Sequence, residues 1–184
     1  MQIRHVILDR DGVLNHEAQD GSYVLRPADF HWLPGVLDAV VRLHRQGIRL
    51  SVASNQSPVG RGLMTRERLE AIDAAMLADV RAAGAALDAT FYCVHAPDED
   101  CACRKPRPGL INAAVAAAHI AAGHTVFVGD DVKDIEAALA GGVGPVLVRS
   151  GKGRATETVV TQRGLKVPIY DDLAQFAATI TRAS

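Results

Sequence analysis

Two aspartates, Asp9 and Asp11, follow a short apolar run near the start of the chain and directly precede Gly12. Side chains two residues apart on an extended segment point to the same side, so both carboxylates should enter one cleft beyond the end of a strand. Two crowded carboxylates repel each other unless a cation lies between them or one keeps its proton. A hard divalent cation such as Mg²⁺ takes oxygen ligands of this kind. The pair therefore predicts a cation-assisted reaction, with two solvated aspartates at a strand end as the plainer alternative.

Other polar side chains follow later apolar runs in the same way. Ser54 follows one run, Lys105 lies in a loop before a predicted helix, and Asp130 follows another run. Because the carboxyl ends of parallel strands share one edge of a sheet, we expect these side chains to meet there. Each position alone also fits an ordinary polar loop.

Together these residue types suit phosphoryl transfer through an aspartyl-phosphate. In this hypothesis Asp9 attacks phosphorus, and Asp11 protonates the leaving group and later activates water. Mg²⁺ is held by Asp9, by the backbone carbonyl of Asp11 and by Asp130. Ser54 and Lys105 stabilise the transferring phosphoryl oxygens.

A second group of metal-binding residue types lies in one short stretch and includes every cysteine of the chain: Cys93, His95, Cys101 and Cys103. Three thiolates and one imidazole form a closed tetrahedral set suited to Zn²⁺. The alternative is three free or buried thiols. A structural zinc would hold this loop, residues 93–103, and with it the adjoining Arg104 and Lys105.

Positioning these groups requires strands that alternate with helices. Apolar runs predict strands ending at Leu8 and over 48–53, 90–94, 125–128, 145–148 and 167–170. Helices are predicted over 36–46, 65–83 with Thr65 as N-cap, 108–118, 132–140 and 172–181, and a short helix within the polar segment 149–161. A polar loop is expected over 16–22. The pattern indicates βαβ units: an α/β, Rossmann-like, mainly parallel sheet with helices on both faces. No large insertion interrupts it, so we expect a single domain over 1–184 without a cap domain.

Composition excludes several partners. The chain has 184 residues, of which 48% are hydrophobic and 22% charged, as in a soluble globular protein. A net charge of −1 and only 4% aromatic residues argue against nucleic-acid binding. No apolar run is long enough to span a bilayer, and the sequence begins without a signal peptide. We therefore expect a cytoplasmic protein, a monomer, that acts on a small molecule.

At this point the sequence resembles a known family. The segments DRDGVLN, SNQ, Lys-Pro and GDD, in this order, are similar to the four motifs of the haloacid dehalogenase-like (HAD-like) phosphatases, over about residues 3–153. Within them the chain resembles the capless D-glycero-D-manno-heptose-1,7-bisphosphate phosphatases and the related histidinol-phosphate phosphatases. The segments that carry this narrower resemblance are DRDG with Asn15, Tyr23-Val24, SNQS with Arg61-Gly62, and CVHAPDEDCACRKP.

The resemblance implies the catalytic roles given above, a zinc loop over 93–103, and substrate contacts from Asn55, Gln56 and Arg104. Arg61 and Arg104 are candidates for binding a second phosphate or sugar hydroxyls, because a guanidinium can bind an oxyanion through two hydrogen bonds. The implied reaction is Mg²⁺-dependent removal of the C7 phosphate of the heptose bisphosphate.

Three alternatives stay open: a histidinol-phosphate phosphatase, another small sugar-phosphate phosphatase, and, less favoured, a non-catalytic phospho-acceptor. Two positions depart from the family pattern: Asp131 stands where lysine is common, and Pro58 where glycine is common. Asp134 either braces Lys105 or the metal site, or is an ordinary aspartate on a helix surface.

Overall fold

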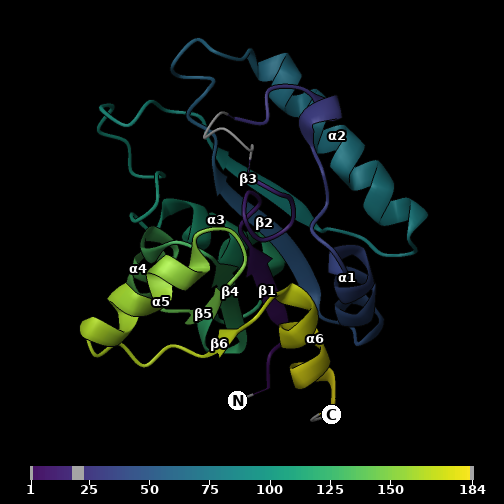
Figure 1. The fold of residues 1–184 in the computed structure, drawn as a ribbon. Helices are drawn as coiled ribbons and strands as arrows, with labels where there is room; N and C mark the ends of the chain where they lie inside the picture. The colour runs from purple at the N-terminus through teal and green to yellow at the C-terminus, as the bar shows by residue number, and fades with distance from the viewer. Residues whose placement is uncertain (1, 18–22, 183–184) are drawn as a thin grey trace.

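The computed structural model describes residues 2–17 and 23–182 (Figure 1). Their strands form one parallel sheet in the order β3-β2-β1-β4-β5-β6. The strands are β1 (His5–Leu8), β2 (Arg49–Asn55), β3 (Ala89–Cys93), β4 (Thr125–Gly129), β5 (Gly144–Val148) and β6 (Ile169–Tyr170).

Helices cover both faces of this sheet, as the sequence predicted. They are α1 (Val36–Arg45), α2 (Arg66–Ala82), α3 (Gly109–Ala118), α4 (Val132–Ala140), α5 (Gly153–Gln162) and α6 (Leu173–Arg182), with short 3₁₀ turns η1 (Pro27–Asp29) and η2 (Ala122–His124). Helices α1, α2 and α6 pack on one face, and α3, α4 and α5 on the other (Figure 1). Within 2–17 and 23–182, every helix is too short or too polar to cross a membrane.

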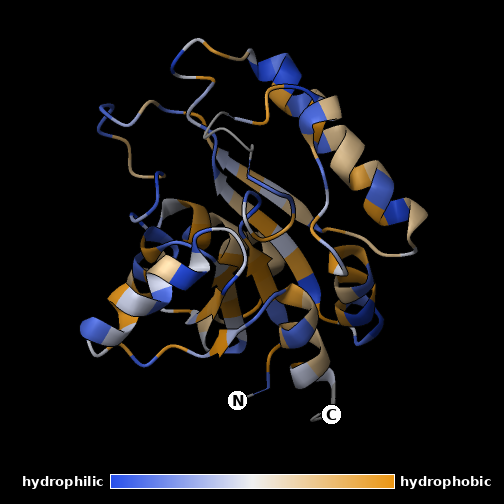
Figure 2. Cartoon of the chain, viewed as in Figure 1, coloured by the Kyte–Doolittle hydropathy of each residue, from blue (hydrophilic) through white to orange (hydrophobic). Residues whose placement is uncertain are grey.

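The apolar run of β1 is buried on both sides of the sheet. Val6 and Leu8 face the core formed with α1 and α6, whereas Ile7 faces the core formed with α3. Alternate residues of a strand point to opposite faces, so a strand covered on both faces must be apolar throughout. The orange interior of the sheet in Figure 2 shows this pattern.

Strand β1 lies at the point where the order of the sheet reverses. The chain builds outward from β1 to β3 on one side and then returns to place β4 on the other side of β1. The backbone N–H of Asp9 donates to Val128 O (2.9 Å), which extends the pairing of β1 with β4 by one residue. Ligands of open α/β sheets bind in the crevice at such a reversal, beyond the carboxyl ends of the strands. Asp9 and Asp130 therefore flank that crevice.

The boundaries of several elements differ from the sequence prediction. Strand β2 extends two residues further, to Asn55, and β6 has only two residues. The segment 149–161 was expected to hold a short helix, but α5 has ten residues, because Thr156 and Val160 are buried against the sheet. Thr65 is confirmed as an N-cap, since its hydroxyl accepts from Arg68 N (3.3 Å). The predicted loop 16–22 lies partly outside the described residues.

Candidate active site

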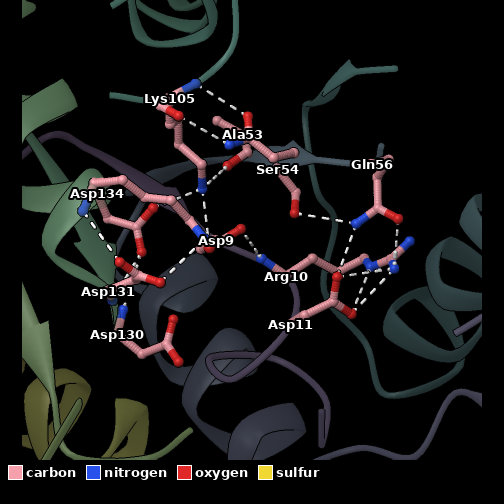
Figure 3. A network of polar contacts seen from close by, with 12 residues as sticks. Asp9, Arg10, Asp11, Ala53, Ser54, Gln56, Lys105, Asp130, Asp131 and Asp134 are labelled. Carbon is pink, nitrogen blue, oxygen red and sulfur yellow. Dashed lines mark hydrogen bonds and ion pairs between the residues drawn. The ribbon is translucent and has the colours of Figure 1, made fainter. Parts of the chain in front are cut away.

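Asp9 is the first residue after β1 and is only 5% exposed. One carboxylate oxygen, Oδ1, accepts a hydrogen bond from the backbone N–H of Arg10 (2.7 Å). The other, Oδ2, lies 2.9 Å from Lys105 Nζ. Both oxygens are thus held in place, with a cation beside one of them (Figure 3).

Lys105 brings a buried positive charge to residues from β2, from the end of β1 and from the first turn of α4. Its Nζ contacts Asp9 Oδ2, Asp134 Oδ1 (2.8 Å) and the carbonyl of Ala53 (3.0 Å). Burial disfavours the ammonium form, but the neighbouring carboxylates of Asp134 and Asp9 outweigh it and raise the pKa of Lys105. Asn55 fixes the backbone of Lys105 through two hydrogen bonds, at 3.0 and 3.1 Å. The side chain therefore stays charged in a fixed position.

Three buried carboxylates crowd together beside this lysine. Asp9, Asp130 and Asp134 each offer an oxygen, and the three oxygens lie within 4.8 Å of one another. Burial, together with the negative charges of Asp134 and Asp9, raises the pKa of Asp130 to about 8. Burial also raises the pKa of Asp134 to about 6, although Lys105 opposes this. A donor set of crowded oxygens that cannot all ionise alone fits a hard divalent cation such as Mg²⁺.

The loop after β5 closes tightly around Asp130. Gly12 and Gly151 both have positive φ (86° and 53°), and a Cβ on either would overlap Asp130 Oδ2. The same oxygen accepts a hydrogen bond from Lys152 N (2.8 Å). Glycine is required at both positions because only a residue without Cβ permits this conformation and this approach.

Helix α4 begins with a capping box that includes Asp131, the first of the two positions that depart from the family pattern. The Asp131 side chain accepts from Lys133 N (3.2 Å), and Asp134 Oδ2 accepts from the backbone N–H groups of Asp131 (3.0 Å) and Asp130 (3.2 Å). Asp134 is buried, so it is not an ordinary aspartate on a helix surface. It orients Asp130 and pairs with Lys105 at the same time.

Asp11 faces the same cleft but belongs to a separate polar network. Its carboxylate contacts Arg10, Asn15 and Gln56, and it is not part of the cluster around Asp130. Burial opposes its ionisation, yet Arg10 and the side-chain amides of Asn15 and Gln56 lower the pKa of Asp11. Figure 3 shows the two networks on either side of Asp9.

The cleft between these networks has a volume of about 370 Å³. Asp9, Asp11, Ser54 and Asp130 line it together. Further polar side chains on its wall are Glu17, Tyr23, Asn55, Gln56, Ser57, Arg61, Arg104, Lys133 and Lys152. The cleft is thus lined by both acidic and basic side chains.

The four residues predicted to bind zinc meet beside the cleft. Sγ of Cys93 lies 3.6 Å from Sγ of Cys101 and 3.2 Å from that of Cys103, and His95 Nδ1 lies 3.5 and 3.2 Å from Cys93 and Cys103. A tetrahedral zinc site with Zn–S bonds of about 2.3 Å separates its ligand atoms by roughly 3.5–3.8 Å. The cysteines are free thiols, and the four residues fit one Zn²⁺.

Comparisons with known proteins agree with this geometry. A family model described as HAD-hydrolase-like matches residues 102–176. The D-glycero-β-D-manno-heptose-1,7-bisphosphate 7-phosphatase of Pseudomonas putida is 42% identical over 173 residues, which cover 94% of this chain and 96% of that protein. The chain belongs to the heptose bisphosphate phosphatase family.

Solved structures of this family share the fold. The D,D-heptose 1,7-bisphosphate phosphatase from Bordetella bronchiseptica, complexed with magnesium and phosphate, is 35% identical and superposes with a TM-score of 0.91. The match covers 99% of this chain and 100% of that one. The enzyme from Burkholderia thailandensis is 34% identical with a TM-score of 0.72, over 96% of this chain and 97% of that one. The HAD-like sheet expected from the sequence is thereby confirmed.

The predicted substrate-binding side chains differ in whether they already form hydrogen bonds within the protein. Arg61 and Arg104 line the cleft, and Arg104 Nη1 is buried without a hydrogen-bond partner among the described residues. By contrast, the amide of Asn55 is engaged with the backbone of Lys105, and that of Gln56 with Arg10 and Asp11. Gln56 also donates to Ser54 Oγ (3.2 Å). The side chains of Asn55 and Gln56 thus fix the positions of other residues of the site.

Sequence reasoning missed Arg10, Glu17 and Lys152. Lys152 Nζ pairs with Glu17 Oε1 (2.8 Å) across the cleft wall, between two segments far apart in the sequence. No sequence pattern joins those two residues. Arg10 did carry a signal, because an arginine between two aspartates at the end of a buried strand must itself be buried or paired.

Proposed function

We propose that this protein is a Mg²⁺-dependent phosphatase that removes the C7 phosphate of D-glycero-D-manno-heptose 1,7-bisphosphate through an aspartyl-phosphate on Asp9. One observation carries the proposal: Asp9 lies at the sheet reversal with its oxygens fixed, beside a buried lysine and two further carboxylates. The names and coverage of the relatives support the substrate.

The cation would be held by the carboxylates of Asp9 and Asp130 and the backbone carbonyl of Asp11, with Asp134 orienting Asp130. When bound, Mg²⁺ supplies positive charge that screens a carboxylate from a phosphate dianion. Asp11 carries a proton when the negative charge of the bound phosphate counteracts the effect of Arg10 on its carboxylate. Asp9 then attacks phosphorus, the bond to the sugar oxygen breaks, and Asp11 donates that proton to the sugar oxygen. Asp11 then takes a proton from the water that hydrolyses the aspartyl-phosphate. Ser54 and Lys105 stabilise charge around the phosphoryl group.

The rest of the substrate is recognised on the cleft wall. Arg61 and Arg104 form no ion pair within residues 2–17 and 23–182, so their charges are available to a second phosphate. A buried guanidinium N–H without a partner favours an oxyanion ligand, because leaving it unpaired is costly. Asn55 and Gln56 support this wall and are proposed to contact the substrate only at its reacting end.

The test is phosphate release from a panel of sugar phosphates with Mg²⁺, for the native protein and for Asp9→Asn. We expect heptose 1,7-bisphosphate to give the highest kcat/KM and Asp9→Asn to lose at least about a thousandfold in turnover while staying folded. Retained turnover in folded Asp9→Asn would refute the nucleophile. A higher kcat/KM for histidinol phosphate would favour the alternative phosphatase. A phosphorylated Asp9 stable for minutes, without turnover of any monoester, would favour the phospho-acceptor.

We further propose that Cys93, His95, Cys101 and Cys103 hold a structural zinc that orders the loop 93–103. The short distances between their ligand atoms and the position of Lys105 two residues after Cys103 support this. Elemental analysis should find about one Zn per chain, and the Cys101→Ser/Cys103→Ser variant should lose it. Asp98→Asn, on the exposed tip of the same loop, should keep it. Zinc-free native protein with full activity would refute the proposal.

The remaining sequence expectations are also proposals: one domain over 1–184, a monomer, and a cytoplasmic location without a nucleic-acid or membrane partner. A small-molecule substrate bound in a cleft of a single chain is consistent with them. Sedimentation of the purified protein tests the monomer.

A further inference from the structure

Arg10 is among the largest side chains that are fully buried, with 1% of its surface exposed. Removing a guanidinium from water costs several kcal/mol unless charged and polar partners replace the water. The partners of a buried arginine therefore indicate its role in the structure. Its partners belong to the cleft, since Arg10, Asp11 and Gln56 all line it.

The guanidinium grips the carboxylate of Asp11 on both oxygens. Nε and Nη2 lie 3.2 and 3.0 Å from Oδ1, and Nη2 lies 3.0 Å from Oδ2. Gln56 closes a ring, because its Oε1 accepts from Arg10 Nη2 (2.9 Å) and its Nε2 donates to Asp11 Oδ2 (2.8 Å). Asn15 donates to Oδ1 (2.9 Å). Three side chains from two segments thus fix one carboxylate.

The guanidinium is itself held. Its Cζ lies 6.0 Å from the ring centre of Tyr92 on β3, a distance at which a cation is attracted to the ring face. The Tyr92 hydroxyl donates to Asp73 Oδ1 (2.6 Å) on α2, which fixes the ring. The backbone N–H of Arg10 also binds Asp9 Oδ1. One residue therefore restrains two carboxylates that have different tasks.

We propose that Arg10 is the positioning residue of Asp11: its side chain keeps that carboxylate in the cleft and apart from the oxygens of Asp9, Asp130 and Asp134. Without this hold, Asp11 is free to rotate toward any cation bound by that cluster, where it no longer reaches the leaving group. The inference rests on the proposed function, in which Asp11 passes a proton to the sugar oxygen as the P–O bond breaks and the electron pair moves to that oxygen.

Leaving-group dependence separates this role from a merely structural one. An alkyl oxygen needs a proton as it leaves, whereas 4-nitrophenolate leaves without one. We therefore expect Arg10→Met to lower the single-turnover rate of leaving-group release from heptose bisphosphate by about a hundredfold, the typical contribution of a positioned acid, and that from 4-nitrophenyl phosphate by less than about fivefold. Single-turnover rates are compared because Asp11 also activates water in the later hydrolysis step, which is the same for both substrates. Arg10→Lys keeps the charge but offers one point of contact, so it should recover part of the loss.

Two further variants make the result decisive. Arg149→Met removes an arginine that binds Glu157 through two hydrogen bonds (2.7 and 2.8 Å) outside the cleft, and it should change neither rate. Asp11→Asn should reproduce the leaving-group dependence of Arg10→Met. If Asp11→Asn shows that dependence and Arg10→Met lowers both rates equally, or neither, the proposal is wrong and the proposed function stands. If Asp11→Asn turns over both substrates like the native protein, the proposed acid–base role fails first.

Should Arg10→Met not fold, Gln56→Met gives the same decision, because it removes the amide that joins Arg10 to Asp11. We expect its single-turnover rate of leaving-group release to fall about fivefold more on heptose bisphosphate than on 4-nitrophenyl phosphate, a smaller effect since the direct Arg10–Asp11 contacts remain. An equal fall on both substrates would overturn the proposal.

Discussion

Lys105 neutralises two buried carboxylates, Asp9 and Asp134, so its removal leaves uncompensated negative charge in the interior. We expect Lys105→Met to lower the free energy of unfolding by about 3 kcal/mol near neutral pH, the range found when one partner of a buried pair is removed. The loss should shrink at acidic pH, where the orphaned carboxylates take up protons. Urea unfolding at both pH values measures it.

Lys133→Met is the matched control for that experiment. Lys133 pairs with Asp131 (3.0 Å), but both side chains are partly exposed, at 34% and 24%. A pair of this kind contributes at most about 1 kcal/mol. Equal losses of unfolding free energy in the two variants would contradict the prediction that Lys105 stabilises the fold by neutralising buried carboxylates.

The crowding around Asp130 also predicts how magnesium binding depends on pH. Burial and the nearby Asp134 and Asp9 raise the pKa of Asp130 to about 8, so below that pH a proton competes with the cation. We expect the apparent Mg²⁺ affinity to rise about tenfold per pH unit between about pH 6 and 8 and then to level off. Calorimetric titration measures this.

Asp134→Asn is the matching variant, because it removes one of the charges that raise the pKa of Asp130 while keeping a side-chain acceptor for the capping box. Its affinity should level off at a lower pH than that of the native protein. An affinity that does not change between about pH 6 and 8 would contradict the prediction.

At the scale of elements, the loop from β5 to α5 acts as a wall against Asp130. Gly151 packs against Asp130 Oδ2 with a φ of 53°, so Gly151→Ala must displace that carboxylate or the loop. We expect this variant to weaken Mg²⁺ binding at least about tenfold, since the ligand geometry itself changes. The measurement is the Mg²⁺ concentration that gives half-maximal turnover.

Gly164→Ala separates this displacement from backbone strain. Gly164, after α5, has a similar φ of 66°, but nothing lies within 4 Å of the position of its added Cβ. The left-handed conformation then costs about 1–2 kcal/mol of stability and leaves metal binding unchanged. If both variants weaken Mg²⁺ binding to the same extent, contact between the loop at Gly151 and Asp130 does not determine the affinity for Mg²⁺.

Some of these elements could be predicted from the sequence and others could not, depending on whether their buried residues form an apolar pattern. The runs at Val6–Leu8 and Val126–Val128 gave β1 and β4, because a strand covered on both faces must be apolar, and Asp9 and Asp130 followed from where the runs end. The length of α5 was underestimated, because its three buried residues are a glycine, a threonine and a single valine, which form no apolar pattern. Contacts between segments distant in the sequence, such as Glu17 with Lys152, leave no local pattern to read.

At the scale of the whole molecule, the reversal in strand order explains how a few residues from distant segments come together in one site. Asp9, Ser54 and Asp130 come from β1, β2 and β4, which lie side by side, and Lys105 reaches the same point from the loop before α3. The sequence could predict this meeting point from topology. It could not predict that the carboxylates of the cleft divide into two networks, because that division depends on side-chain directions around Arg10.

The opposite end of the same strands holds a buried histidine that links them. His5 Nε2 lies 3.0 Å from Ser51 Oγ on β2, and its Nδ1 lies 3.4 Å from Thr125 Oγ1 on β4. Burial lowers the pKa of His5 to about 4, from 6.5 in an unfolded chain. Between about pH 4 and 6.5 the unfolded chain binds a proton at His5 that the native protein does not bind. The contribution of neutral His5 to the free energy of unfolding is therefore complete above about pH 6.5 and is lost as the pH falls toward 4.

We therefore expect the free energy of unfolding of the native protein to fall by about 1–2 kcal/mol more than that of His5→Gln when the pH is lowered from about 7 to 5. Comparing the two proteins isolates His5, because the raised pKa of Asp130 changes stability with pH in the opposite direction and is common to both. Gln keeps a donor and an acceptor for Ser51 and Thr125, so the two chains differ mainly in the titrating group. Urea unfolding at both pH values decides it, and parallel losses would mean that His5 is already neutral in the unfolded chain or charged in the folded one.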